Sequence, residues 1–456
     1  MTAVLTVAVL LIVYGVTSRP LDRRGITSAM TFVTLGLVTG ASGFGWLDVP
    51  LDSAVVERLT ELALVFLLFS DSVRMDLKAL RHSAAWPSRL LVIAIPGTMV
   101  LGFVMGLVVF PGMAVASAFL LATMLCSTDA ALGQRVVDDP RVPPRVRQAL
   151  DVESGFDDGI AVPFFLVALD LTMATLVGGV TSAVLTNIAA QIGWGLLAGL
   201  STGAVGGLAL RQADRRGWIK PEWRQAVTFA IAISAYAVAV TLGGSGFIAA
   251  FVGGMVFGAV SGQHGLRTTY LTEEVGNVLA AVTWMGFGAL AISAVWHDIT
   301  WKVVLYAVLS LTVVRMVPVA IAMLRTGAAR QTVAFMGWFG PRGLASVVFL
   351  LLAMERGIPG SGDIAATVVA TVGLSVFLHG LTAGPLVGAY HRWFTRQATR
   401  AAAAGCKTPL AEGKATVVPR TRRHPDPNED SAVPAARGSR ATTAADGIPL
   451  GESPHG

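Results

Sequence analysis

The chain has 456 residues, of which 54% are hydrophobic and only 14% are charged. Soluble globular domains carry about 25% charged residues, so this composition excludes a soluble protein and, over most of the length, a disordered one. The net charge of +6 is typical of basic cytoplasmic loops in a membrane protein and does not require nucleic-acid binding. Cys126 and Cys406 are the two cysteines, and they form neither a disulfide framework nor a metal-binding pattern.

Thirteen apolar segments follow one another along the chain, each near the length that an α-helix needs to cross a bilayer. We therefore expect an all-α polytopic membrane protein with about thirteen transmembrane helices. Basic residues follow the first apolar run instead of preceding it, which favours a membrane span over a signal peptide. The segments are residues 2–17, 26–43, 58–74, 90–110, 112–133, 151–172, 186–210, 224–241, 243–260, 276–295, 302–324, 331–354 and 364–390.

Basic residues give the expected orientation. The odd-numbered loops carry 19 Lys and Arg residues and the even-numbered loops carry 3. By the positive-inside rule the odd loops are cytoplasmic, so we expect a plasma-membrane protein with its N-terminus outside. Residues 1–395 then form the transmembrane domain. Residues 396–456, rich in Ala, Arg, Pro, Gly and Thr, are expected to be a disordered cytoplasmic tail that can contact membrane lipid.

Ionisable side chains within the spans are few, and each is a candidate functional residue because burying a charge in hydrocarbon is costly. The group comprises Asp71, Asp129, Glu153, Asp157, Asp158, Asp170, Arg315 and Arg342. At the end of the fifth segment, Ser127 and Thr128 precede Asp129 and interrupt an apolar run. Polar, helix-competing residues at this depth predict a broken helix that lines a cavity.

The densest group of acids opens the sixth segment. On a helix, Glu153 and Asp157 share one face, and Ser154 and Asp158 share the neighbouring face. Carboxylates and hydroxyls are hard oxygen ligands for a cation, and a desolvated carboxyl group also binds a proton. The pattern therefore predicts a site that takes either a cation or a proton. The alternative, acids that only favour a helix N-terminus at the membrane surface, accounts for Glu153 better than for Asp157 and Asp158.

The eleventh and twelfth segments contain two arginines. Arg315 lies in the middle of its run and needs a carboxylate partner, either Glu153 or Asp157, and we favour Glu153. Pro341 and Arg342 stand among glycines in the twelfth segment and predict a second broken helix. Because the fifth and twelfth spans are seven apart, they cross in opposite directions. Two such broken helices indicate an inverted-repeat secondary transporter, with spans 1–6 and 8–13 joined by span 7.

Five stretches, taken together, resemble the bacterial NhaP-type members of the monovalent cation/proton antiporter-1 family, which includes the sodium/hydrogen exchangers. The resemblance extends over about residues 5–390. The stretches are Leu64–Arg74 (LVFLLFSDSVR), Ser127–Asp129 (STD), Glu153–Asp158 (ESGFDD), Gly244–Gly254 (GSGFIAAFVGG) and Gly340–Gly343 (GPRG).

The resemblance implies an antiporter that exchanges Na⁺ or K⁺ for H⁺ by alternating access, as a homodimer and without a cofactor. It implies that Glu153 and Arg315 form a structural ion pair. It also implies that Asp158 and Asp129 bind the transported cation, and the proton in turn. The full set of implied ion- and proton-binding residues is Asp158, Asp129, Thr128, Ser154, Asp157 and Asp71.

The chain departs from the family pattern at two places. Ala130 stands where Pro usually follows Thr-Asp, and Asp157 stands where the family usually has Asn. A double aspartate is similar to the antiporter-2 group, whose members are often electrogenic, so both electroneutral and electrogenic exchange stay open. Na⁺ and K⁺ both take oxygen ligands, so both remain candidate substrates.

Rival interpretations also follow from the sequence. A cation channel or uniporter would share the polar interior but would need a continuous pore. An intramembrane serine protease would use Ser245 of the Gly-Gly-Ser-Gly stretch with His379, and an aspartyl protease would use Asp129 with Asp158. We favour a transporter over an enzyme.

Overall fold

The computed structural model describes residues 2–41, 43–47, 54–75, 85–176, 179, 181–262, 268–358, 361–403 and 411–413. Within these ranges the chain forms helices and no β-strand. Eight helices in the described part are long and apolar enough to cross a membrane, and four shorter apolar helices accompany them. The prediction of an all-α polytopic membrane protein is therefore confirmed. Lys78, Arg81, Arg267 and most of the expected tail lie outside the described residues.

The described helices fall into groups that correspond in order to the thirteen apolar segments, and five of the segments consist of more than one helix. The bounds are α1 (Thr2–Arg23), α2 (Ser28–Thr39), α3 (Ala54–Val73), α5 (Ala85–Arg89), η1 (Leu90–Ala94), α6 (Ile95–Val109), α7 (Val115–Met124), α8 (Ala130–Val137), α9 (Pro144–Leu176), α10 (Ser182–Arg215), α11 (Pro221–Thr241), α12 (Gly246–Ser261), α14 (Tyr270–Gly286), η2 (Phe287–Ala291), α15 (Ile292–Val295), η3 (Trp296–Asp298), α16 (Trp301–Leu311), α17 (Val313–Ala322), α18 (Arg330–Trp338), α19 (Leu344–Glu355), α20 (Ser361–Ala403) and η4 (Ala411–Gly413). The last long helix, α20, continues past residue 396, where the tail was expected to begin.

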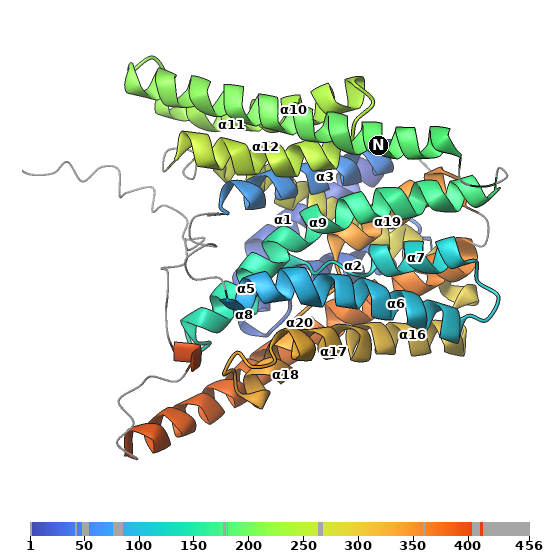
Figure 1. Ribbon diagram of the computed structural model, residues 1–456, viewed down its shortest axis with the longest axis vertical. Helices are drawn as coiled ribbons and strands as arrows, with labels where there is room; N and C mark the ends of the chain where they lie inside the picture. The colour runs from blue at the N-terminus through green and yellow to red at the C-terminus, as the bar shows by residue number, and fades with distance from the viewer. Residues whose placement is uncertain are drawn as a thin grey trace, which may run out of the picture. The chain divides into compact units, whose positions relative to one another are not determined.

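The helices pack as two groups that alternate along the chain. The first group contains α1–α3 and α10–α15, and the second contains α5–α9 and α16–α20. Figure 1 shows α3, α10, α11 and α12 on one side of α9, and α5, α6, α17 and α18 on the other. Contacts between the groups are made mainly by α9, α19 and α20. The helix α9, which carries the densest group of acids, therefore lies where the two groups meet.

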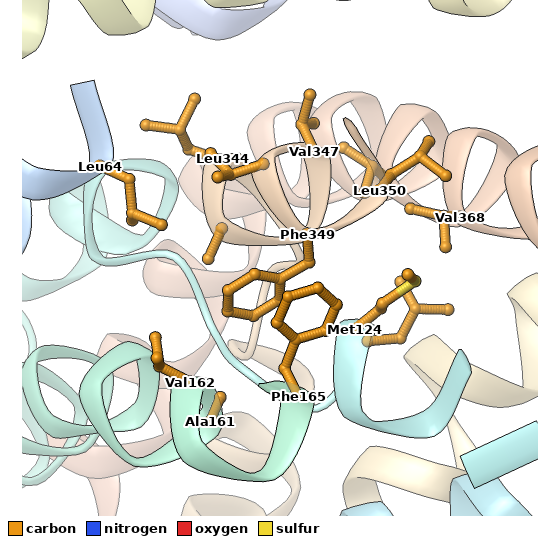
Figure 2. Close-up of a cluster of buried hydrophobic side chains, with 14 of the residues drawn as sticks. Leu64, Met124, Ala161, Val162, Phe165, Leu344, Val347, Phe349, Leu350 and Val368 are labelled. Atoms are coloured by element: carbon orange, nitrogen blue, oxygen red, sulfur yellow. The ribbon is translucent and has the colours of Figure 1, made fainter. Parts of the chain in front are cut away.

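The hydrophobic core between α9 and α19 is centred on two stacked rings. Phe165 and Phe349 lie 4.3 Å apart between ring centroids with an interplanar angle of 13°, and both are fully buried. Figure 2 shows Met124 beside the pair and Leu344 in the same cluster. Because Met124 ends α7 and Leu344 begins α19, this packing anchors both interrupted helices against α9.

Within the first group, glycines let α10 lie directly against α12. A Cβ atom on Gly199 would lie 2.7 Å from the carbonyl oxygen of Ala249, and one on Gly203 would lie 2.4 Å from that of Gly253. Those distances are shorter than any ordinary contact, and the obstacle is backbone. Close approach of helices through small residues is the usual way that membrane helices gain packing energy.

We expect Gly203→Ala to destabilise the protein by about 1–3 kcal/mol, because the added methyl group overpacks a backbone contact. Gly193→Ala is the matched control, since it lies on the same helix and its Cβ would meet nothing within 4 Å. The measurement is thermal unfolding of the purified protein in detergent. Equal midpoints for the two variants would contradict the close contact.

Candidate functional site

Two interrupted helices cross in the second group of helices. α7 ends at Met124 and α8 starts at Ala130, while α18 ends at Trp338 and α19 starts at Leu344. The backbone N–H of Asp129 donates to the carbonyl oxygen of Pro341 over 2.8 Å, so the two non-helical stretches touch. We call the pair of stretches, residues 125–129 and 339–343, the crossing. The expected broken helices in spans 5 and 12 are confirmed.

The Asp129 carboxylate caps two helices at the crossing. Its Oδ1 accepts from the backbone N–H of Leu132 over 3.0 Å, and its Oδ2 accepts from the N–H of Leu344 over 2.8 Å. It therefore satisfies unpaired N–H groups of both α8 and α19 and faces the positive ends of both helix dipoles. Only glycine fits at position 343, where a Cβ would lie 1.9 Å from Asp129 Oδ2.

The Arg342 guanidinium donates hydrogen bonds to backbone carbonyl oxygens just past the C-terminal end of α7. Its Nη1 donates to the carbonyl oxygens of Cys126 over 2.5 Å and of Ser127 over 3.0 Å. The side chain is fully buried, and Ser346 Oγ donates to a third carbonyl, that of Met124, over 2.7 Å. A cation here balances the negative end of the α7 dipole. Positive and negative ends of the broken helices are thus each matched by an opposite charge.

Asp157 of α9 is tied to the same crossing. Its Oδ2 accepts from the backbone N–H of Thr128 over 3.0 Å and from the Thr128 hydroxyl over 2.8 Å. The Thr128 hydroxyl also lies 3.2 Å from Ser154 Oγ. Asp157 is fully buried. The sequence prediction treated Asp157 as part of an acidic pair, whereas its hydrogen bonds make it the link between α9 and the first break.

Asp158, the next residue, differs from Asp157. Its side chain is partly exposed. Like Oδ1 of Asp157, its Oδ1 is buried without a hydrogen-bond partner among the described residues. Asp129, Asp157 and Asp71 are all near enough to interact with it electrostatically. Several carboxylates facing one another favour a bound cation or proton that neutralises them. In the described part of the chain no three His, Cys, Asp or Glu side chains form a resident metal site.

Glu153 and Arg315 form a buried, two-pronged ion pair beside the crossing. Arg315 Nη1 donates to Glu153 Oε1 over 2.8 Å, and Nη2 donates to Oε2 over 2.9 Å. Each side chain is only 1% exposed. Gly340 makes room for the guanidinium, because a Cβ there would lie 2.2 Å from Arg315 Nε. The pair therefore joins α9 to α17 and passes directly against the second break.

A polar network behind the second break was not predicted. Ser375 Oγ accepts from the backbone N–H of Arg342 over 2.7 Å and lies 3.2 Å from His379 Nδ1. His379 Nε2 lies 2.9 Å from the carbonyl oxygen of Trp338. These residues of α20 satisfy backbone groups that the break leaves free. Ser375 sits in an apolar helix with no sequence signal, so only the structure reveals its role.

The remaining candidates lie elsewhere. Asp170 of α9 accepts from Gln191 over 2.9 Å and lies 3.7 Å from Arg356. Ser245 caps α12 by accepting from the backbone N–H of Ile248, while His379 contacts Ser375 and Trp338. Neither residue has the other among its partners, and a serine protease would need that contact.

An all-helical membrane protein whose two interrupted helices cross beside buried carboxylates has the architecture of a secondary transporter. A family model described as "Sodium/hydrogen exchanger, transmembrane" matches residues 6–389. This is most of the chain, and the chain therefore belongs to the sodium/hydrogen exchanger family.

The chain is also similar to individual cation/proton antiporters in sequence and in fold. The chain is 26% identical to Na(+)/H(+) antiporter 2 of Zygosaccharomyces rouxii over 71% of its own length and 42% of that protein. It is 24% identical to the K(+)/H(+) antiporter NhaP of Alkalimonas amylolytica over 78% of its length and 61% of that protein. The chain thus spans less than two thirds of both relatives. The sodium proton antiporter MjNhaP1 of Methanocaldococcus jannaschii has the same fold, with a TM-score of 0.67 and 18% identity over 84% of this chain and 99% of that one.

We expect Glu153→Gln to destabilise the protein by about 3–5 kcal/mol, because it leaves the Arg315 guanidinium buried without its counter-charge. Replacing both partners with leucine should cost less than the single change. Arg58→Ala is the control, since Arg58 pairs with Glu61 but its side chain is 62% exposed, and such pairs contribute at most about 1 kcal/mol. Thermal unfolding in detergent measures all three, and a stable Glu153→Gln protein would refute the structural role.

Proposed function

We propose that the protein is a secondary active antiporter that exchanges Na⁺ or K⁺ for H⁺ across the cell membrane. The observation that carries this proposal is a partly exposed carboxylate, Asp158, close to three other carboxylates and beside the charge-balanced crossing. Its Oδ1 has no hydrogen-bond partner among the described residues. The names of the relatives, two cation/proton antiporters that differ in their ion, support both cations. The proposal makes the protein a transporter and not an enzyme.

In this mechanism Asp158 is the exchange site. A carboxylate can be neutralised by a cation or by a proton, but the same oxygen lone pairs cannot take both at once. Binding one substrate therefore releases the other, and exchange is obligatory. Thr128, Ser154 and Asp71 would supply further oxygen ligands for the ion in this mechanism. Asp129 would contribute through the lone pairs that its two helix caps leave free.

Alternating access would follow from movement of the two helix groups against each other. The site residues of α7, α8, α9 and α19 belong to the second group, while α3 with Asp71 belongs to the first. A site at the boundary between two bodies is exposed to one side or the other as they rock. The proposal keeps the N-terminus outside, the tail in the cytoplasm and a homodimeric assembly.

We expect wild-type protein in proteoliposomes to move protons when Na⁺ or K⁺ is applied, and Asp158→Asn to lose this movement by at least about a hundredfold. The amide cannot carry the charge that cation and proton neutralise in turn. An internal pH dye records the movement, and a proton ionophore controls for leaks. Tracer cation flux without coupled proton movement would instead favour a channel or uniporter.

We expect Asp157→Asn to keep exchange within about tenfold of wild type. An asparagine side chain retains a carbonyl oxygen that can accept both hydrogen bonds from Thr128, and those bonds are what the structure assigns to this position. The same liposome assay measures it, together with the response to membrane voltage. If Asp157→Asn abolished exchange as fully as Asp158→Asn, both acids would have to bind transported ions.

A further inference from the structure

A second hydrophobic core lies apart from the one around Phe165 and joins the ends of several helices in the second group. Trp86 of α5, Val146 of α9, Phe335 of α18 and Tyr390 of α20 are among its buried members. Ala411 of η4, far along the chain, packs against the same core. In the proposed orientation this core is at the cytoplasmic end of the molecule.

Glu412, the neighbour of Ala411, is buried in this contact. Its side chain belongs to a residue only 3% exposed. Its Oε1 accepts from the backbone N–H of Ala329 over 2.9 Å and from the hydroxyl of Thr332 over 2.9 Å. The Thr332 hydroxyl lies 2.9 Å from that of Tyr390. One carboxylate of the tail therefore connects α18 to α20.

Arg145, in the first turn of α9, holds the same segment from the other side. Its Nη1 donates to the carbonyl oxygen of Ala411 over 2.9 Å, and its guanidinium lies over the Trp86 ring at 4.2 Å from the centroid. Its positive charge also attracts the Glu412 carboxylate. A backbone carbonyl, a carboxylate and an apolar methyl group of the tail are thus all matched by complementary groups.

The contact with the tail provides a hydrogen-bond acceptor at the N-terminal end of α18. Ala329 is its N-cap residue and has no side-chain oxygen with which to cap the helix. Glu412, over eighty residues later in the sequence, accepts the cap N–H and places a negative charge at the positive end of the helix dipole. α18 leads directly into the break at Phe339–Gly343. The tail therefore acts on the helix that positions Arg342 in the crossing.

We propose that this surface on α5, α9, α18 and α20 is a docking site for the chain's own C-terminal segment, anchored by Glu412, and that docking controls transport by holding the start of α18. A docked tail keeps α18 capped and the crossing in register. An undocked tail leaves the first turn of α18 free to fray, and transport slows. The docking surface lies wholly on the second group of helices, so it does not oppose movement between the groups.

The test is hydrogen–deuterium exchange on the full-length protein in nanodiscs. Losing two hydrogen bonds to a charged group should shift the balance toward the undocked state by roughly tenfold or more. Glu412→Ala should therefore speed exchange at Ala329–Val333 by about that factor. Glu412→Gln keeps an acceptor oxygen but loses the negative charge, so amide exchange at Ala329–Val333 should speed up less than in Glu412→Ala. Glu355→Ala, which removes an exposed acid at the end of α19, should change nothing at α18.

Transport by the same variants tests the second half of the proposal. The expected result is a several-fold slower exchange in proteoliposomes for Glu412→Ala, a smaller slowing for Glu412→Gln and normal exchange for Glu355→Ala. Unchanged amide exchange at α18 in Glu412→Ala would overturn docking. Faster amide exchange with an unchanged transport rate would overturn control of transport by the tail. The amide measurement does not depend on antiport activity, so a failure of the proposed function would be seen separately.

Discussion

The structure depends on charge compensation at the crossing of two broken helices. Interrupting a helix inside a membrane frees backbone N–H and C=O groups that lipid cannot satisfy. Asp129 accepts from the first turns of α8 and α19, and Arg342 donates to two carbonyls of the break that follows α7. Asp129 serves its own broken helix and the other one, and Arg342 serves the other one. The two breaks therefore satisfy part of each other's free backbone groups.

The ion pair of Glu153 and Arg315 extends this arrangement to α9 and α17. A buried pair contributes little net stability over apolar residues of the same size, but losing one partner is severe. Here the ion pair fixes how the helices that carry it lie relative to each other. The guanidinium fills the space that Gly340 leaves open, so α17 and the second break have one register relative to α9. Asp157 and Asp158 are then presented to the crossing in a defined order.

Much of the fold could be predicted from the sequence, because span length and the placement of basic residues are local signals. The breaks were also predictable, since Pro341 and the polar run ending at Asp129 stand out in apolar segments. The hydrogen-bond partners of the side chains at the crossing could not be predicted. Both oxygens of Asp129 accept backbone N–H groups, and backbone groups carry no sequence signature. Ser375 and Glu412 were missed for a related reason, because their partners lie on helices distant in sequence.

The two adjacent aspartates illustrate why sequence spacing alone leaves roles open. Consecutive residues on a helix point about 100° apart, so neighbouring acids face different surroundings. Asp157 faces the first break, where Thr128 donates two hydrogen bonds to one of its oxygens. Asp158 is partly exposed, interacts with Asp129 and Asp71, and keeps an oxygen without a partner among the described residues. Asp157 also keeps one such oxygen, Oδ1, so what separates the two aspartates is the pair of hydrogen bonds from Thr128 and the complete burial of Asp157. A double aspartate is therefore compatible with a single exchanging carboxylate.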